Sequence, residues 1–288
     1  MFESIAICGL VRNAEEALTK TLVSVSSIAE LAHECVAVIA TNDNQDSTDV
    51  ILSAWQASND RNTVLRFDGL AAHLPNKIER IAMLRNACLA HVHAQTINPE
   101  FVLILDLDGP NINVTAESIF ASMLSLDFIW DGIFFNQPDA YYDIYALRHR
   151  TWCPQDCWQE VTRATGGLFG RGLFGRYLRR KAIEKFVYDR QVRIPGNYRP
   201  ISVESAFGGF AIYRYESIRE TWYSPRNKQG AIECEHVSFN LSISANGGQL
   251  FILPSLINDA PQEHLGSTSG KYSIDRYLSF DLFISDTR

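Results

Sequence analysis

Residues 101–110 read Phe-Val-Leu-Ile-Leu-Asp-Leu-Asp-Gly-Pro, a run of five apolar residues followed by a polar turn. A short, continuous apolar run of this kind is typical of a strand buried on both faces of a parallel sheet. The run ends at two aspartates, Asp106 and Asp108, which flank a single leucine. The stretch therefore predicts a central strand with two carboxylates at its carboxyl end.

The sequence before this stretch alternates between strand-like and helix-like segments. Strands are predicted at 4–11, 35–40 and 62–67, and helices at 13–31, from 46 or 47 onward, and at 77–95. In the first helix, Asn13 followed by Glu15 and Glu16 resembles an N-cap with a capping box. Strands that alternate with helices indicate right-handed βαβ units and a mostly parallel sheet.

The sequence after the stretch is less regular. Further strands are predicted at 131–135, at 142–147, after the glycines of 206–214 and at 248–257, with a helix from Glu233 to about Ala245. We expect an α/β fold with a mixed, mostly parallel sheet flanked by helices. The 288 residues are predicted to form a single domain with two halves, residues 1–110 and residues 111–288.

Composition and charge narrow the class of protein. A net charge of −7 argues against general attraction to nucleic acid. Residues 1–4 contain no basic region, and no apolar run approaches the roughly 20 residues that span a bilayer, so we expect neither a signal peptide nor a membrane span. The six cysteines fit buried thiols in a reducing, cytoplasmic compartment. Cys153 and Cys157 could form half of a zinc site, but no second cysteine pair has ligand spacing.

Polar residues follow three of the predicted parallel strands. They are Arg12-Asn13, Asn42-Asp43 and the Asp106/Asp108 pair. In open α/β sheets the carboxyl ends of the strands form the ligand-binding edge. The sequence therefore predicts that these side chains meet in one site.

Asp106 and Asp108 carry the chemistry of this predicted site. Because burying two carboxylates without a cation is costly, a hard divalent ion such as Mg²⁺ or Mn²⁺ is their natural complement. Such an ion usually completes its ligands with substrate phosphates and water. The alternative is a solvated turn, because Asp-x-Asp-Gly also suits a turn.

Several motifs, taken in chain order, resemble the glycosyltransferases of the GT-A fold over nearly the whole chain. The motifs are Ile7-Cys8-Gly9-Leu10-Val11-Arg12-Asn13, Asn42-Asp43 with Asp46-Ser47-Thr48-Asp49, Asp106-Leu107-Asp108, Gly208-Gly209, Glu233-Cys234-Glu235-His236 and His264. The Cys-Gly-Leu-Val-Arg-Asn opening, residues 141–148 and Cys-Glu-His-Val further resemble the fungal capsule-associated mannosyltransferases and related bacterial enzymes. The resemblance implies a GT-A-like fold and sugar transfer from a nucleoside diphosphate sugar (a GDP- or UDP-sugar) to a glycan or lipid-linked acceptor, with Mn²⁺ or Mg²⁺. Surface polysaccharide or lipopolysaccharide synthesis would be the setting. Residues 1–110 would bind the nucleotide sugar, and residues 111–288 would bind the acceptor.

The resemblance also implies roles for single residues. Arg12 and the Asn42-Asp43 loop would contact the ribose or base, and Gly208 and Gly209 would let the backbone approach a sugar. For the metal, Asp108 would be a direct ligand, Asp106 would touch ribose or metal-bound water, and His264 would complete the shell. The alternative for His264 is a solvated loop histidine.

Glu233 and Glu235 precede a predicted helix, where a carboxylate is stabilised by the helix dipole in any case. A capping role therefore competes with catalysis. If the reaction inverts the anomeric centre, one of them should deprotonate the acceptor hydroxyl; His236 is a third candidate base or a metal ligand. If the reaction retains configuration, no such base is needed.

Further cations could meet the diphosphate. Arg80 and Arg85 lie on the helix before residues 101–105, where either one could stabilise a leaving diphosphate or simply be solvated. Residues 163–193 hold nine Lys and Arg against two acids and contain a tandem Gly-Leu-Phe-Gly-Arg at 167–176. This basic segment could be a lid, a patch for an anionic membrane or lipid-diphosphate acceptor, or a mobile surface loop with an exposed helix.

Two other classes of protein remain open. Residues 101–109 also resemble the opening motif of haloacid-dehalogenase-like phosphatases, with Asp106 as nucleophile and Asp108 as acid/base. That motif normally begins its fold, whereas three strand–helix units precede it here. A non-catalytic nucleotide-sugar-binding module is the other alternative, because a fold does not determine chemistry.

Overall fold

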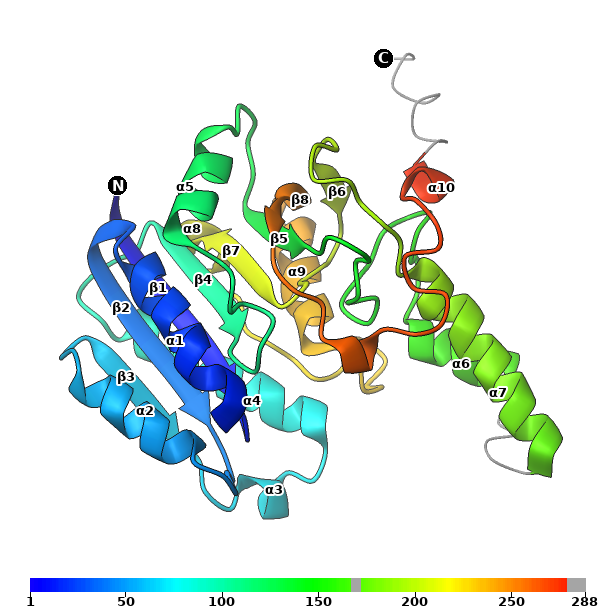
Figure 1. Ribbon diagram of the computed structural model, residues 1–288, viewed down its shortest axis with the longest axis horizontal. Coiled ribbons are helices and arrows are strands. Elements are labelled where there is room, and N and C mark those ends of the chain that lie inside the picture. Colours follow the sequence, from blue (N-terminus) through cyan, green and yellow to red (C-terminus); the bar gives the residue numbers. More distant parts are fainter. Residues whose placement is uncertain (167–171, 279–288) are drawn as a thin grey trace.

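The computed structural model describes residues 1–166 and 172–278. Its centre is an eight-stranded sheet in the order β3-β2-β1-β4-β7-β5-β8-β6 (Figure 1). The strands are β1 (Phe2–Val11), β2 (Ala32–Thr41), β3 (Asn62–Arg66), β4 (Phe101–Asp106), β5 (Gly132–Asn136), β6 (Ile201–Val203), β7 (Phe210–Arg214) and β8 (Leu250–Ile257). The α-helices are α1 (Glu15–Ala29), α2 (Thr48–Ala57), α3 (Leu70–His73), α4 (Lys77–His93), α5 (Ala116–Leu124), α6 (Cys157–Ala164), α7 (Gly172–Phe186), α8 (Tyr215–Ile218), α9 (Glu235–Ala245) and α10 (Asp275–Leu278). Two 3-10 turns are η1 (Tyr188–Arg190) and η2 (Gln262–His264).

The sheet is mixed, and its direction reverses at one strand. β1 pairs in parallel with both β2 and β4, and β2 pairs in parallel with β3. β7 is antiparallel to its two neighbours, β4 and β5, so β5 regains the direction of β4. β8 is parallel to β5, and β6 is antiparallel to β8. The predicted fold class is confirmed: a mostly parallel mixed α/β sheet flanked by helices.

Helices cover both faces of the sheet. On one face α1, α2 and α5 bury residues such as Leu18, Trp55 and Ile119 against the strands. On the other face α4 and α9 bury Leu89 and Phe239 in a second apolar cluster. The strands are buried on both sides, which is why they appear in the sequence as continuous apolar runs rather than as alternating ones.

The strand directions bring distant segments to one edge of the sheet. β1, β2, β4, β5 and β8 all run toward this edge, and β7 starts there because it is antiparallel. The residues after β1, β2, β4 and β8, and those before β7, therefore meet at the lower edge in Figure 1. The predicted meeting of residues 12–13, 42–43 and 106–108 follows directly from this order.

The predicted N-cap of the first helix is wrong. α1 begins at Glu15 with Ala14 as its N-cap, and Asn13 has a left-handed backbone with φ of 50°. The Asn13 side chain accepts a hydrogen bond from the backbone N–H of Gln45 at 2.8 Å. Asn13 thus connects the ends of β1 and β2 instead of capping the helix.

The predicted strand at 142–147 is also wrong, because these residues form an irregular turn. Ile144, Ala146 and Leu147 are buried in the second apolar cluster, while Asp143 accepts a hydrogen bond from the Ala146 N–H. The alternation of apolar and polar residues comes from a turn packed over the core, which has the same periodicity as a short strand.

The basic segment 163–193 is largely helical where it is described. α6 and α7 pack on each other at the end of the molecule farthest from β3 (Figure 1). The first copy of the repeat, at 167–171, lies outside the described residues. Among the described residues, no helix is long and apolar enough to cross a membrane.

Candidate active site

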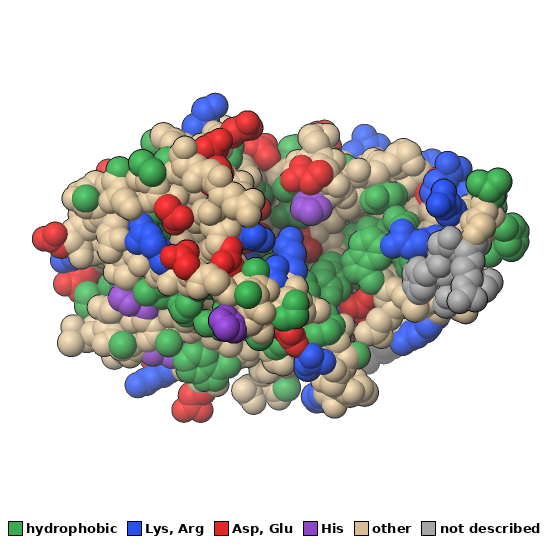
Figure 2. Space-filling view, turned by 90° about the horizontal axis from the view of Figure 1, so that it is seen from below, with side chains coloured by type: hydrophobic (Ala, Val, Ile, Leu, Met, Phe, Trp, Pro, Cys, Tyr) green, Lys and Arg blue, Asp and Glu red, His purple; other side chains and the backbone are tan. Residues whose placement is uncertain are grey.

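A cavity of about 680 Å³ lies at the polar edge of the sheet. Its walls come from the ends of β1, β2 and β4, from α4, from the turn at 142–145, from the start of α9 and from η2. Figure 2 shows this face of the molecule, which is hollowed beside a group of acidic, basic and histidine side chains. The cavity is therefore built from segments that span almost the whole described chain.

Most of the residues predicted for the site line this cavity. They are Arg12, Asn42, Arg80, Arg85, Asp106, Asp108, Glu235, His236 and His264. The cavity wall does not include Asp43, Gly208, Gly209 or Glu233, whose contacts with protein are described below.

Arg85 is the central cation of the cavity. Its side chain is only 5% exposed, and its Nε donates to Glu235 Oε1 at 3.0 Å while Nη2 donates to Asp106 Oδ1 at 2.9 Å. The guanidinium also lies 4.8 Å from the centroid of the Phe207 ring. Although burial alone would lower the pKa of Arg85, the charges of Asp106 and Glu235 raise it above its usual value. Arg85 therefore stays charged and fixes the orientation of both carboxylates.

Asp108 lies at the mouth of the cavity beside Asp106. The surrounding protein removes part of the hydration of the Asp108 carboxylate, and the charge of Asp106 opposes its ionisation, so its pKa is raised to about 6. Lys77 and His264 act in the opposite direction. Because the neighbouring carboxylate opposes the ionisation of Asp108, a cation bound here would be stabilised.

This donor set fits Mn²⁺ or Mg²⁺. Asp106 uses Oδ1 to accept from Arg85, which leaves Oδ2, and the described chain shows no cation within ion-pair distance of the Asp108 carboxylate. His264 lines the same cavity, and its ring stacks on Tyr142 with centroids 5.7 Å apart. Within residues 1–166 and 172–278, no three His, Cys, Asp or Glu side chains already converge on one point. The residues present match an ion that takes its remaining ligands from phosphate and water.

Arg12, Asn42 and Asp43 form a linked loop at the ends of β1 and β2. The Asp43 carboxylate accepts hydrogen bonds from Gly69 N at 2.6 Å, Ala71 N at 2.8 Å and the Asn42 side chain at 2.8 Å. The Asn42 and Ala71 bonds lower the pKa of Asp43 most. Asp43 thus fixes the loop before α3, while Arg12 and Asn42 face the cavity.

Gly208 and Gly209 lie before β7 with positive φ values of 66° and 81°. A Cβ at Gly208 would come within 2.6 Å of the Phe135 carbonyl oxygen, and one at Gly209 within 2.9 Å of Tyr142 Oη. The Gly209 carbonyl accepts the backbone N–H of Asp106 at 3.0 Å. The two glycines therefore let the backbone before β7 approach Phe135 and Tyr142 closely, and Gly209 also holds the end of β4 in place.

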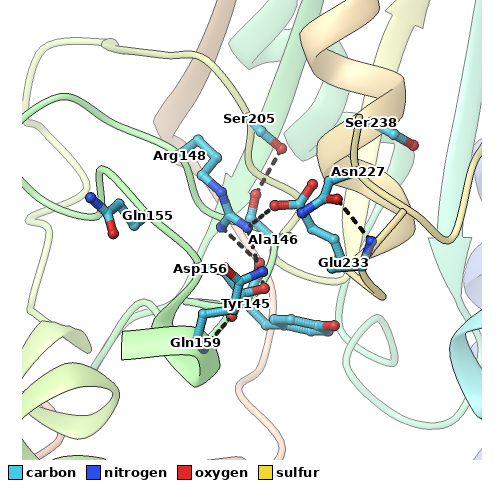
Figure 3. Close-up of polar contacts among 12 residues, drawn as sticks. Tyr145, Ala146, Arg148, Gln155, Asp156, Gln159, Ser205, Asn227, Glu233 and Ser238 are labelled. Carbon is cyan, nitrogen blue, oxygen red and sulfur yellow. Dashed lines mark hydrogen bonds and ion pairs between the residues drawn. The ribbon is translucent and has the colours of Figure 1, made fainter. Parts of the chain in front are cut away.

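The two candidate glutamates have different surroundings. Glu235 is the first residue of α9, is buried, and faces the cavity in its ion pair with Arg85. Glu233 accepts a hydrogen bond from Arg148 Nη2 at 2.9 Å, next to Asp156 (Figure 3). Glu233 therefore belongs to a second buried ion-pair cluster behind the cavity wall.

His236 is buried and its imidazole stacks on Phe207 with ring centroids 3.7 Å apart. Among the described residues neither ring nitrogen has a hydrogen-bond partner, although Nε2 lies 3.5 Å from Glu235 Oε1. Burial lowers the pKa of His236 well below its usual value, and the charge of Arg85 acts in the same direction. The imidazole is therefore neutral at physiological pH.

Arg80 is held at the edge of the cavity by a local turn. Its Nη1 donates to the carbonyl oxygens of Leu74 at 2.6 Å and Pro75 at 2.9 Å. Arg80, Lys77 and Arg12 all line the cavity.

The sequence prediction missed several residues of the wall, notably Lys77, Tyr142, Asp143, Tyr145 and Trp158. Lys77 has a recognisable signal, because it opens the helix that precedes the Asp106/Asp108 strand. Residues 142–145 alternate between apolar and polar side chains, so the sequence predicts a strand there and not part of the cavity wall. Trp158 and Tyr145 have no signal in the sequence, since their position depends on how α6 packs.

Comparisons with known proteins are limited to solved structures. No family model matches the chain, and no curated protein matches it. S. aureus TarS in complex with UDP is 13% identical, with a TM-score of 0.46 over 91% of this chain and 62% of that chain. The mannosyltransferase PcManGT from Pyrobaculum calidifontis, in complex with GDP-Man and Mn²⁺, is 11% identical, with a TM-score of 0.46 over 90% and 57%. Glucosyl-3-phosphoglycerate synthase from Mycobacterium tuberculosis, in complex with UDP, is 12% identical, with a TM-score of 0.42 over 96% and 79%.

The chain spans less than two thirds of the length of the TarS and PcManGT chains that it matches. Similarity at this level does not assign an activity. The function must therefore be inferred from the residues of the cavity.

Proposed function

We propose that the chain is a metal-dependent glycosyltransferase that moves a sugar from a nucleoside diphosphate sugar to a glycan or lipid-linked acceptor, in surface polysaccharide or lipopolysaccharide synthesis. One observation supports this most strongly. Asp106, Asp108 and His264 line one cavity at the carboxyl edge of the sheet together with the buried Arg85. This edge is where open α/β sheets bind nucleotides.

The donor diphosphate would meet the metal-binding residues. Asp108, the free oxygen of Asp106 and His264 would hold Mn²⁺ or Mg²⁺, which when bound neutralises charge on the leaving diphosphate. Arg85 keeps Asp106 oriented for this task, since it occupies the other carboxylate oxygen. Arg80 and Lys77, on the adjacent wall, would attract the same diphosphate.

The nucleoside would lie over the ends of β1 and β2. Arg12 and the buried Asn42 face the cavity there, and Asp43 keeps their loop in shape through Gly69 and Ala71. A GDP- or UDP-sugar is the donor class that this arrangement suits. Gly208 and Gly209 act through the position of Asp106 rather than by direct contact with a sugar.

Transfer is tested with UDP-glucose, UDP-GlcNAc and GDP-mannose, by release of nucleoside diphosphate in the presence of Mn²⁺. We expect Asp108→Ala to abolish release, whereas Asp139→Ala, an exposed aspartate, should retain it. Wild-type release from Asp108→Ala, or full release in excess EDTA, would contradict the proposal. Trapping of a beryllium fluoride adduct on Asp106 would instead favour the phosphatase alternative.

The acceptor side suggests contact with a membrane surface. α7 exposes Leu173 and Phe174, whose residues are 85% and 70% exposed, beside a largely basic sequence. Apolar side chains among Lys and Arg suit an anionic lipid surface, such as the inner face of a membrane that carries a lipid-linked acceptor. We expect sedimentation with vesicles that contain about a third anionic lipid, and loss of it in Leu173→Ser/Phe174→Ser, but not in Val50→Ser on α2. Equal sedimentation of all three proteins would contradict this contact.

A further inference from the structure

Asp143 lies in the cavity wall, in the turn between β5 and α6. Its Oδ1 accepts a hydrogen bond from Ala146 N at 3.2 Å, and its Oδ2 accepts one from Gly208 N at 3.2 Å. Each carboxylate oxygen therefore has a lone pair left for another donor. The side chain is partly exposed, and the cavity is the space that it faces.

Within the described chain, Asp143 differs from Asp106, Glu235 and Glu233 in its lack of a cationic partner, a property that it shares with Asp108. Arg85 pairs with Asp106 and Glu235, and Arg148 pairs with Glu233. In the part of the chain that the structure describes, no Lys or Arg lies within ion-pair distance of Asp143. A proton acceptor must keep its basicity, which an ion pair with arginine removes. Asp143 keeps its basicity and, unlike Asp108, is held by two backbone N–H groups and is not one of the proposed metal ligands.

Arg148 and Ser205 hold the turn that follows Asp143 (Figure 3). Arg148 Nη1 donates to the carbonyl oxygens of Tyr145 at 3.1 Å and Leu147 at 2.7 Å. Ser205 Oγ donates to the Ala146 carbonyl at 2.7 Å. Because Ala146 in turn donates to Asp143, the carboxylate is held in one orientation by buried contacts.

The surroundings of Asp143 also suit proton transfer near neutral pH. Loss of hydration raises its pKa to about 6, although the two backbone N–H groups act against this. The charged groups that face it are Asp106 at the end of β4 and Glu235 at the start of α9, and both contribute to the raised pKa. A base is most effective when its pKa lies near the working pH.

We propose that Asp143 is the proton acceptor for the acceptor hydroxyl in the transfer reaction, which would then invert the anomeric centre. The acceptor O–H proton goes to a carboxylate oxygen of Asp143. The acceptor oxygen forms its bond to the anomeric carbon as the bond from that carbon to the diphosphate oxygen breaks. The nucleoside diphosphate leaves with the electron pair. This inference rests on the proposed function.

The test compares Asp143→Asn with Asp139→Asn, an exposed aspartate four residues earlier. With UDP-glucose, UDP-GlcNAc and GDP-mannose as probes and water or an alkyl glycoside as acceptor, kcat of Asp143→Asn should fall by about 10²- to 10⁴-fold. Donor affinity, measured by calorimetry, should change less than about threefold, because the proton acceptor does not hold the nucleotide. Asp139→Asn should behave as wild type in both measurements.

Asp143→Ala separates proton transfer from a structural role. It leaves a carboxylate-sized space beside Ala146 N and Gly208 N, so added formate should restore part of kcat, an effect that a merely structural aspartate would not show. With saturating Mn²⁺, which keeps Asp108 ionised, the fall of wild-type kcat on lowering the pH through about 6 should disappear in Asp143→Asn measured without formate.

The inference is overturned if Asp143→Asn keeps kcat within about threefold of wild type, or if formate restores nothing to a folded Asp143→Ala that still binds donor. It is also overturned if the sugar is transferred with retention of configuration. These outcomes leave the proposed function standing. In contrast, a wild-type protein that neither binds nor consumes any of the three donors overturns both proposals.

Discussion

Two buried arginines, Arg85 and Arg148, bind two glutamates that lie two positions apart in the sequence. Arg85 pairs with Glu235 at 3.0 Å, and Arg148 pairs with Glu233 at 2.9 Å. Both arginine side chains are almost fully buried, with 5% and 6% exposed, and each also meets an aspartate. By residue type and burial the two clusters are nearly equivalent.

The two clusters differ in the hydrogen-bond partners of their arginines. Arg148 directs Nη1 to two backbone carbonyls and Nη2 to Glu233 and Asp156, so both of its terminal nitrogens are engaged within the protein. Arg85 lines the cavity, and its Nη1 has no hydrogen-bond partner among the described residues. A buried ion pair alone therefore does not mark a candidate site. An incompletely satisfied cation at a cavity wall makes a stronger candidate.

The largest effect is expected from Arg85→Met. Removing the cation leaves the buried Glu235 and the partly exposed Asp106 unpaired, which should lower the free energy of unfolding by about 3–5 kcal/mol. Transfer should fall by about 10²- to 10³-fold, and donor binding should weaken, because Asp106 loses its orientation. Urea denaturation and calorimetry measure the two effects. Wild-type donor affinity in Arg85→Met would contradict the claim that the Arg85 cluster, unlike the Arg148 cluster, supports donor binding.

Arg148→Met should be equally destabilising but should affect function differently. It breaks a buried cluster, which costs about 3–5 kcal/mol of unfolding free energy. Donor affinity should stay within about threefold of wild type, whereas kcat should fall about tenfold because the Asp143 turn loosens. Weaker donor binding without a change in kcat would contradict the separation of the clusters.

Glu235→Gln and Glu233→Gln make a matched pair two residues apart. Each should lose about 1–3 kcal/mol of unfolding free energy, because the charged arginine then faces a neutral acceptor instead of a carboxylate. Glu235→Gln should also reduce transfer about tenfold through Arg85, whereas Glu233→Gln should stay within about threefold. Equal losses of activity in the two variants would show that both clusters serve the cavity equally.

His236→Phe should give the smallest effect, and one that depends on pH. Because the pKa of His236 is depressed in the folded protein, the unfolded chain binds a proton first as the pH falls below about 6.5. The contribution of this residue to stability is therefore present above about pH 6.5 and is lost below it, at up to about 1.4 kcal/mol per pH unit. Between pH 7.5 and 5.5, urea denaturation of His236→Phe should show a smaller loss than wild type. Parallel curves would mean that His236 has an ordinary pKa.

Much of the fold was predictable from local patterns. The apolar runs at 4–11 and 101–105 reveal buried parallel strands, and strand order then brings their polar ends together. The predictions for Asn13 and for residues 142–147 were wrong because tertiary contacts, not local sequence preferences, determine the structure there. Asn13 bonds to the loop after β2, and residues 142–147 pack as a turn over the core.

The ion pairs of the candidate site could not be predicted from the sequence. Arg85 and Glu235 are 150 positions apart, so nothing local connects them. Glu233 and Glu235 look alike in sequence, and their different partners depend on where Arg85 and Arg148 reach them. Asp143 became a candidate once its environment showed that it lacks a cationic partner.

The proposed function is tested most directly by titrating GDP-mannose and UDP-glucose into wild type and Asp108→Asn in a calorimeter, with and without Mn²⁺. We predict that wild type binds at least one of these donors in the presence of Mn²⁺, and that either EDTA or Asp108→Asn weakens this binding by at least about tenfold. Binding that is equally tight in all conditions, or no binding of either donor by wild type, would contradict the assignment.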